Sequence, residues 1–314
     1  MVAPAWRRGL TRGYHPNVSA GVQKRIGAAA PDGNPRTPRI AVPPLACDCH
    51  AHVFGPESRY PMIPAALYGP PDAAGAADFN RMLDALGVQR AVLVQPSAYG
   101  TDNRAMLDAL AADPGRMRGI AVVPFDVDGQ TLERLHAQGV RGVRCNIVDL
   151  KSGAGRLPRD ELRGLARRVK PFGWHVELLL HVDEFPDLDR QLADFPVDVS
   201  FGHLGYAPTA SGTQGAGFRA LLRLARDGRA WVKLTGPYRL TAQELPYPEV
   251  TPFARALLEA APQRLLWGSD WPHVMVKSAM PNDGALLDLL GQWIPDAALR
   301  RRVLVDNPAA LYDF

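Results

Sequence analysis

The sequence has few cysteines and lacks any long hydrophobic run. Among 314 residues there are three cysteines, Cys47, Cys49 and Cys145. Such a small, odd number does not fit the disulfide framework of a secreted domain. No stretch of about 18 apolar residues occurs, so we expect no segment that spans a bilayer. Both absences favour a protein of the reducing cytoplasm.

Acidic residues are almost absent from the first 40 positions. This stretch carries seven lysines and arginines against the single acidic residue Asp32, and it is rich in proline and glycine. The formal net charge of +4 therefore comes from this segment and not from the rest of the chain. For the protein as a whole we predict no nucleic-acid partner. Because so little apolar surface cannot offset the entropy of ordering, we expect residues 1–44 to form an extended or disordered basic arm. We expect residues 45–314 to form one folded domain.

From Leu45 onward, short β-branched runs alternate with longer amphipathic segments. We expect eight strands, at 45–53, 90–95, 118–123, 139–145, 174–182, 197–203, 230–234 and 264–267. We expect helices at 79–86, 103–112, 130–138, 160–169, 188–194, 285–294 and 296–304. Eight βα units predict an α/β protein with a single (β/α)₈ TIM barrel. An open doubly wound sheet is the alternative, but it rarely needs eight units in one domain.

Polar side chains cluster where the expected strands end: His50, His52, Ser97, Arg144, His181, His203, Thr235 and Asp270. The active site of a TIM barrel lies at that end of the strands. His50 and His52 are two residues apart on one strand and therefore point to the same side. An isolated His-x-His is more often a pair of satisfied histidines, but the convergence of several titratable groups favours a catalytic site over a non-catalytic binding barrel.

Several motifs occur in a characteristic order. They are CDCHAHVFGP (47–56), QPSAYGTDN (95–103), VRGVRCN (140–146), GHLG (202–205), WGSDWPH (267–273) and the ending NPAALY. In this order they resemble the amidohydrolase superfamily. More narrowly, they are similar to its branch of 2-pyrone-4,6-dicarboxylate lactonases and sulfomuconolactone hydrolases. The resemblance covers nearly everything after Leu45.

The resemblance implies a hydrolase that opens a carboxylated or sulfonated lactone by water attack on the ester carbonyl, in the breakdown of aromatic compounds. It implies that Asp270 acts as the general base towards the attacking water. His50, His52 and His203 would surround the lactone carbonyl and polarise it or stabilise the oxyanion. This agrees with the chemistry, because ester hydrolysis needs an activated water and a donor at the carbonyl oxygen.

The resemblance also implies a set of substrate-binding residues. Arg144 and Arg239 match positions that hold acidic groups, since a guanidinium pairs with a carboxylate and suits a sulfonate as well. Ser97 and Tyr68 match hydrogen-bonding positions, and His273 is expected to support its neighbours. Plainer alternatives exist: the arginines as surface residues, Ser97 as a turn cap and Tyr68 as a cover over the barrel mouth.

His181, at the end of the fifth expected strand, is a departure from the resembled pyrone lactonase, which works without a metal and has no histidine there. With His50, His52 and Asp270 it reproduces the mononuclear metal set of many other amidohydrolases. Such a set suits one zinc or manganese ion, which would activate water and polarise a carbonyl. The sequence leaves the metal-dependent and the metal-free mechanism both open.

Two further departures concern the substrate. Leu179 replaces an expected tyrosine, and the loop after Asn146 lacks an expected second arginine. We therefore expect the small-molecule partner to be an acidic lactone of a different shape. A metal-dependent decarboxylase of the same superfamily, with the same histidines and Asp270, is the alternative. The patterns indicate no oligomeric state.

Overall fold

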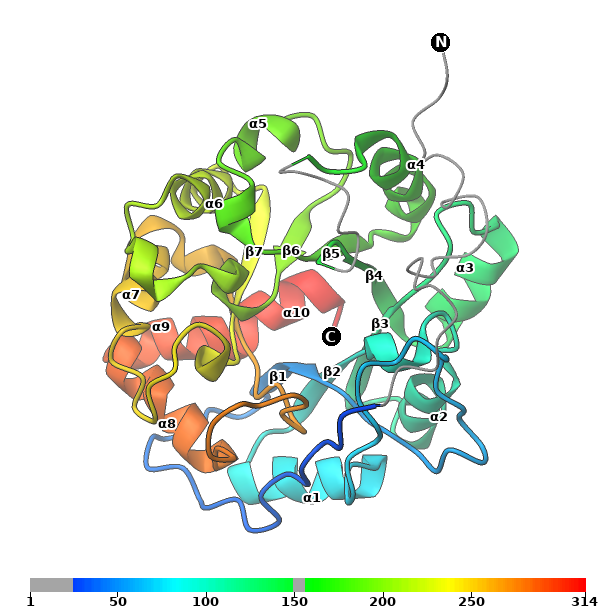
Figure 1. The fold of residues 1–314 in the computed structure, drawn as a ribbon, viewed down its shortest axis with the longest axis horizontal. Helices are drawn as coiled ribbons and strands as arrows, with labels where there is room; N and C mark the ends of the chain where they lie inside the picture. Colours follow the sequence, from blue (N-terminus) through cyan, green and yellow to red (C-terminus); the bar gives the residue numbers. More distant parts are fainter. Residues whose placement is uncertain (1–24, 149–155) are drawn as a thin grey trace.

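The computed structural model describes residues 25–148 and 156–314, and it confirms the TIM barrel (Figure 1). Eight parallel strands lie side by side in sequence order. They are β1 (Cys47–Ala51), β2 (Arg90–Val94), β3 (Met117–Ala121), β4 (Val140–Asn146), β5 (His175–Leu179), β6 (Val199–Phe201), β7 (Ala230–Leu234) and β8 (Leu265–Trp267). Each lies where the sequence predicts a strand, but most are shorter than expected.

Most helices surround the strands on the outside of the barrel, whereas the last one lies near the centre of the ring in Figure 1. The helices are α1 (Ala76–Leu86), α2 (Arg104–Ala112), α3 (Gly129–Ala137), α4 (Arg159–Val169), α5 (Leu188–Gln191), α6 (Ala216–Arg226), α7 (Thr251–Ala260), α8 (Asp283–Trp293), α9 (Ala297–Arg301) and α10 (Asn307–Tyr312). The sequence analysis did not single out α6, α7 or α10. The helix expected at 296–304 ends at Arg301 and continues as a π-helical turn, Arg302–Asp306.

Short 3₁₀ turns follow several strands and carry side chains of the barrel mouth, the end where the strands finish. They are η2 (Ser97–Tyr99), η4 (Val182–Glu184), η5 (His203–Tyr206) and η7 (Pro237–Arg239). Others are η3 (Lys170–Phe172), η6 (Thr209–Ser211) and η8 (Pro262–Arg264). The opposite end is covered by the C-terminal residues: Tyr312 is fully buried, and the guanidinium groups of Arg90 and Arg118 lie over the ring of Phe314.

Two backbone hydrogen bonds join the end of β1 to the residues after β8. Asp270 N donates to His50 O and His52 N donates to Trp271 O, both at 2.8 Å. The buried Asp48 carboxylate adds to this junction by accepting from the backbone N–H groups of His50 (3.1 Å) and Ser269 (3.0 Å). The contacts that join the first and last strands therefore also hold His50 and His52 against Asp270.

Residues 25–44 contain no helix and no strand, but they are bonded to the barrel. The Arg36 guanidinium pairs with Asp288 of α8 at 2.6 Å, and Ile26 forms an isolated bridge with Tyr68. These contacts attach residues 25–44 to the barrel. The expectation for residues 1–24 lies outside the described residues, and the domain boundary at residue 44 stays a prediction.

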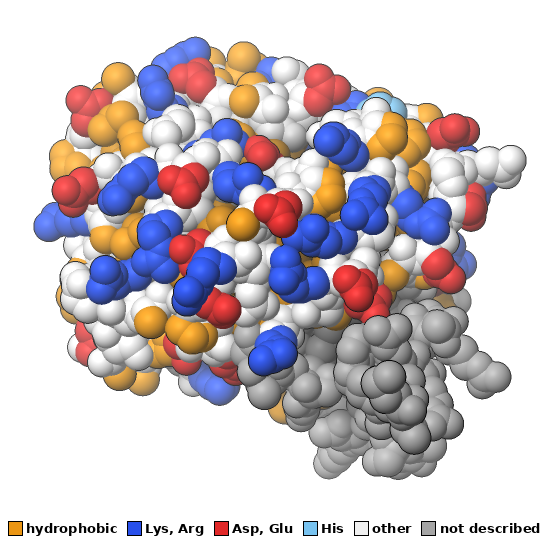
Figure 2. Space-filling model, turned by 90° about the horizontal axis from the view of Figure 1, so that it is seen from above, with side chains coloured by type: hydrophobic (Ala, Val, Ile, Leu, Met, Phe, Trp, Pro, Cys, Tyr) orange, Lys and Arg blue, Asp and Glu red, His pale blue; other side chains and the backbone are white. Residues whose placement is uncertain are grey.

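Two observations concern the expectation that the protein binds neither nucleic acid nor a membrane. On the face in Figure 2, basic and acidic side chains are interspersed. Within the described part of the chain, no helix combines the length and hydrophobicity needed to cross a membrane.

Candidate active site

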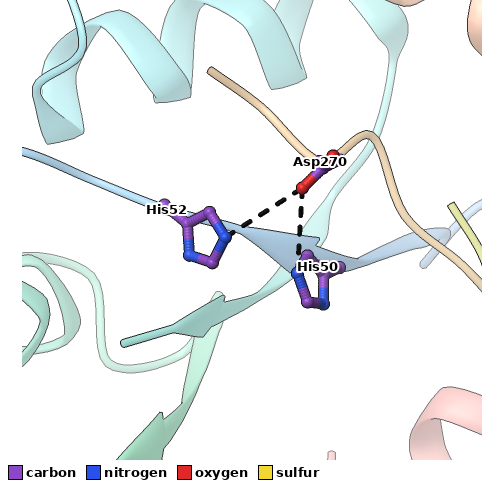
Figure 3. Close-up of side chains that lie close together, drawn as sticks. All are labelled: His50, His52 and Asp270. Carbon is purple, nitrogen blue, oxygen red and sulfur yellow. Dashed lines mark ion pairs between the residues drawn. The ribbon is translucent and has the colours of Figure 1, made fainter. Parts of the chain in front are cut away.

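Three buried side chains converge where β1 and β8 end (Figure 3). His50 lies on β1, His52 directly follows it, and Asp270 follows β8. Asp270 Oδ1 lies 3.8 Å from His50 Nε2 and 4.0 Å from His52 Nε2. All three residues are at most 4% exposed. The structure thus brings together the three residues on which the sequence interpretation most depends.

The two carboxylate oxygens of Asp270 have different surroundings. Oδ2 accepts hydrogen bonds from the Tyr238 hydroxyl and from Arg239 Nε, each at 2.6 Å. Oδ1 is buried and has no hydrogen-bond partner among the described residues. Burial alone would raise the pKa of Asp270, but the charge of Arg239 and its hydrogen bond to Oδ2 bring it below its usual value. Asp270 is therefore a carboxylate with one engaged and one free oxygen.

The backbone carbonyl of Val94 determines the tautomer of His52. His52 Nδ1 lies 2.7 Å from this oxygen, which can only accept, so Nδ1 carries the proton and Nε2 presents a lone pair. Burial lowers the pKa of His52 to about 4, which keeps the ring neutral at neutral pH. His52 Nε2 and Asp270 Oδ1 are then two acceptors facing each other, and only a proton donor or a cation between them makes this arrangement favourable.

A buried ion pair lies beneath His50. Lys233 on β7 pairs with Glu177 on β5, and its ammonium lies 3.3 Å from His50 Nδ1. An ammonium can only donate, so this contact leaves the His50 proton on Nε2, on the side of Asp270. Burial, followed by the charge of Lys233, holds the pKa of His50 well below its usual value, so the imidazole is neutral. The sequence analysis missed both Lys233 and Glu177, although charged residues within the apolar runs AWVKL and HVELL were the available signal.

His203 adds a third neutral imidazole. It begins η5, is 2% exposed, and its ring centroid lies 4.9 Å from that of His50. Its Nδ1 lies 3.8 Å from Asp270 Oδ2, and burial lowers its pKa to about 3. Gly236 makes this approach possible, because a Cβ there would lie 2.6 Å from His203 Nδ1 and 2.9 Å from Asp270 Oδ2.

His181 lies apart from this group. The sequence places it at the end of a strand, but β5 ends at Leu179, and His181 directly precedes η4. It is half-buried, and its ring lies 4.9 Å from that of Tyr206. Among the described residues, the side chains close enough to share a metal ion are His50, His52 and Asp270. Three of the four expected ligands are therefore brought together, without His181.

The expected substrate-binding residues lie around the same cluster. Arg144 on β4 is 7% exposed. Its Nη1 donates to the Gln95 backbone oxygen at 3.0 Å, and its Nε is buried without a partner among the described residues. Burial raises the pKa of Tyr68 to about 12, and Arg144, Ser97 and Arg239 all act on its hydroxyl in the opposite direction. Arg239 differs from the expectation in one respect, because its Nε is already engaged by Asp270.

The group of His50, His52 and Asp270 could hold a divalent ion. Two imidazole nitrogens and a carboxylate oxygen form a donor set that suits zinc or manganese. In such sites the second ring nitrogen commonly donates to a carbonyl or a carboxylate. Val94 O serves His52 in this way, and Glu177 Oε1 lies 3.6 Å from His50 Nδ1. Metal binding at His50 Nε2 would require the His50 proton to move to Nδ1, towards Glu177.

Comparison with known proteins agrees with this arrangement. The chain is 38% identical over 288 residues to a 2-pyrone-4,6-dicarboxylate hydrolase of Comamonas testosteroni, covering 89% of this chain and 93% of the relative. It is 38% identical over 276 residues to a 4-sulfomuconolactone hydrolase of Rhizobium radiobacter, covering 87% and 91%. A crystal structure of a probable 2-pyrone-4,6-dicarboxylic acid hydrolase from Acinetobacter baumannii, with citric acid bound, superimposes with a TM-score of 0.75 at 32% identity, covering 86% of this chain and 100% of that one.

The match extends over the whole barrel. The family model described as amidohydrolase matches residues 47–314, from the first residue of β1 to the last residue of the chain. The histidines of β1 and the aspartate after β8 lie inside this range, as do the arginines expected to bind substrate. The resemblance stated from the motifs is thereby confirmed, and the chain belongs to the amidohydrolase family.

Proposed function

We propose that this enzyme hydrolyses the ester bond of an anionic lactone, with Asp270 as the base that activates water. The observation that carries the proposal is the free Oδ1 of Asp270, which faces His50 and His52 while Oδ2 is fully engaged. The names of the two curated relatives, hydrolases of a pyrone dicarboxylate and of a sulfomuconolactone, support the substrate class. The role in aromatic-compound breakdown, expected from the sequence, is part of the same proposal.

The proton positions suggest how the reaction proceeds. Asp270 Oδ1 and His52 Nε2 both accept, so a water molecule between them is oriented by both and loses its proton to Asp270. His50 presents its Nε2–H to the same space and can donate to the lactone carbonyl as negative charge develops on the oxygen. One well-placed donor of this kind contributes about 10²- to 10³-fold to the rate. His203, neutral and adjacent, can serve as a further donor.

The surrounding cations select the substrate. Arg144 has an Nε without a partner among the described residues, and Tyr68 and Ser97 supply hydroxyl groups beside it. A planar guanidinium suits a carboxylate or a sulfonate. Burying an anion near Arg144 is favourable, whereas a neutral lactone would leave its charge uncompensated; Arg239 is already paired with Asp270. The preference for acidic lactones follows from this arrangement.

A divalent ion held by His50, His52 and Asp270 would polarise the carbonyl and lower the pKa of bound water. The roles of Arg144, Tyr68 and Ser97 in binding the anion are the same with or without it. The three buried, unpaired cysteines support the proposal that the enzyme works in a reducing compartment such as the cytoplasm.

A panel of lactones tests the proposal. Wild-type enzyme is assayed for ring opening of 2-pyrone-4,6-dicarboxylate, 4-sulfomuconolactone and neutral δ-valerolactone, and for release of carbon dioxide. Asp270→Asn should lose at least about 10³-fold in kcat, because it removes the base. Arg144→Met should raise KM for the acidic lactones alone.

Arg141→Met is the matched control for Arg144→Met. Arg141 lies on the same strand, but its guanidinium pairs with Asp313 near the C-terminus. The Arg141→Met variant should leave KM unchanged. Full turnover by Asp270→Asn, or an equal rise in KM for neutral lactones in Arg144→Met, would contradict the assigned roles. Release of carbon dioxide would instead support the decarboxylase alternative.

A further inference from the structure

A chain of buried hydrogen bonds leads from Asp270 to the first turn of α8. The Tyr238 hydroxyl contacts Asp270 Oδ2 at 2.6 Å and His273 Nδ1 at 2.9 Å. His273 Nε2 in turn lies 3.0 Å from Asp283 Oδ1. The three residues Tyr238, His273 and Asp283, here called the relay, are at most 7% exposed. The lactonase roles described above use none of them.

Counting protons fixes the direction of the first bonds of the relay. Asp270 is a carboxylate and can only accept, so the single proton of the Tyr238 hydroxyl points to Asp270 Oδ2. A phenol hydroxyl carries a single proton, and the bond to Asp270 uses it. The Tyr238 oxygen must then accept from His273, which places a proton on His273 Nδ1.

The last bond of the relay contains one proton as well. Either His273 is a cation that donates from Nε2 to the Asp283 carboxylate, or Asp283 is protonated and donates to a neutral ring. In both cases the pair of His273 and Asp283 is neutral overall and His273 Nδ1–H points to Tyr238. Every donor between Asp283 and Asp270 is therefore used in a hydrogen bond. No side chain of the relay can rotate without breaking one of these buried bonds.

This direction determines what Asp270 can do. Oδ2 already accepts from Tyr238 and Arg239 at 2.6 Å each, so its lone pairs in the carboxylate plane are used. Oδ1 is left as the oxygen that faces the imidazoles. The backbone of Asp270 has a φ of 68°, which a residue with a side chain adopts at a cost. Without the relay, the carboxylate would lose the bond that restrains its rotation on the Tyr238 side.

We propose that Tyr238, His273 and Asp283 are positioning residues, which hold Asp270 so that Oδ2 is engaged and Oδ1 alone takes the proton from water. The proposal rests on the proposed function, because it assigns these residues to the same hydrolysis. It predicts that damage to the relay lowers kcat and leaves substrate affinity intact, since none of the three residues belongs to the group expected to bind the substrate anion.

Kinetics of Tyr238→Phe test the proposal with 2-pyrone-4,6-dicarboxylate as the probe. The variant keeps the ring and removes the hydroxyl, and we expect kcat to fall about 10- to 100-fold, as for other small misplacements of a catalytic group, with KM within about twofold. Asp283→Asn should lower kcat in the same sense. The double variant should lose no more than Tyr238→Phe alone, because both substitutions act through one oxygen.

Tyr247→Phe is the matched control. Its ring centroid lies 6.5 Å from that of Tyr238 and it is also buried, at 2% exposed, but its hydroxyl is not part of the relay. It should leave kcat and KM unchanged. An unchanged kcat in Tyr238→Phe, or losses that multiply in the double variant, would overturn the proposal.

A second measurement does not depend on turnover. In wild-type protein labelled with ¹⁵N-histidine, two-bond ¹H–¹⁵N spectra report which ring nitrogens are protonated, and His273→Gln assigns the signal. We expect a proton on His273 Nδ1, and an unprotonated Nδ1 would overturn the proposal. If wild-type enzyme opened no lactone, the proposed function would fail, whereas the spectrum would still decide whether the relay has the direction on which the inference depends.

Discussion

Replacing Lys233 by methionine removes the ammonium from the buried pair beneath His50. Lys233 is 0% exposed and Glu177 is 1% exposed, so water cannot take the place of the lost partner. Leaving the Glu177 carboxylate buried without its cation costs about 3–5 kcal/mol of unfolding free energy. For a domain of this size each 1 kcal/mol corresponds to about 2–4 °C in Tm, and we therefore expect Tm to fall by roughly 10 °C.

Calorimetry and urea unfolding measure this loss, and a second variant shows its cause. Lys233→Met combined with Glu177→Gln removes both charges, and replacing a whole buried pair by neutral groups is often close to neutral in stability. We expect the double variant to recover most of the lost Tm. A single variant as stable as wild type, or a double variant as unstable as the single one, would refute the interpretation of this pair.

The same variants bear on the metal question. Without the Lys233 ammonium, the His50 proton can move to Nδ1, which faces the Glu177 carboxylate at 3.6 Å, and Nε2 becomes free to bind an ion. We expect Lys233→Met to bind Zn²⁺ more tightly than wild type in calorimetric titration. The double variant should lose part of this gain, because the amide that Glu177→Gln introduces accepts a hydrogen bond less strongly than a carboxylate. Equal zinc affinity in wild type and Lys233→Met would contradict the assigned tautomer.

Two further predictions follow from the packing and the histidines. Gly236→Ala should lower kcat at least about tenfold, because its Cβ would enter the space between His203 and Asp270 and small misplacements at a reacting group cost this much; steady-state kinetics of the folded variant check this, and normal turnover would contradict it. Acid should destabilise the protein, because burial lowers the pKa of His52 to about 4 and those of His175 and His203 to about 3. In the unfolded chain these rings take up protons below about pH 6.5, while in the folded protein they stay neutral, so stability falls as pH decreases from about 6.5 towards 4. Each ring contributes about 1.4 kcal/mol per pH unit in this window, which urea unfolding at about pH 7, 5.5 and 4.5 measures; an unchanged midpoint would contradict the assignment of neutral rings.

The barrel could be predicted because strand and helix patterns are local. The run AWVKL predicts a strand at 230–234, and β7 has these same limits. The expected strand at 45–53 is longer than β1 because Leu45 has a φ of 65°, which a strand does not accommodate. The expected strand at 174–182 is longer than β5 for a similar reason, since the chain turns into η4 after His181. This early end explains why His181 does not join the other histidines.

The part of the site that could be predicted is the part that follows from the alternation of side chains along a strand. For the expected strand at 45–53 this rule predicts that His50 and His52 point to the same side, and the rule for the mouth of a TIM barrel predicts that Asp270 lies near them. The partners of these residues were not predictable, because they come from distant segments. Lys233 is 183 positions from His50 in the sequence, and a lysine in an apolar run does not reveal which imidazole it contacts.

The residues proposed to activate water and the residues proposed to select the substrate come from different strands of the barrel. The proposed water-activating group comes from the ends of β1 and β8, which the hydrogen bonds of Asp48 join, whereas Arg144 and Ser97, proposed to bind the substrate, come from β4 and from the turn after β2. Mutations in the second set can therefore alter the fit of a new ring without disturbing the proton-transfer machinery. Arg239 is the exception, because it contacts Asp270 directly. An evolutionary path from one acidic lactone to another would change Ser97 and Arg144 first and leave Arg239 fixed.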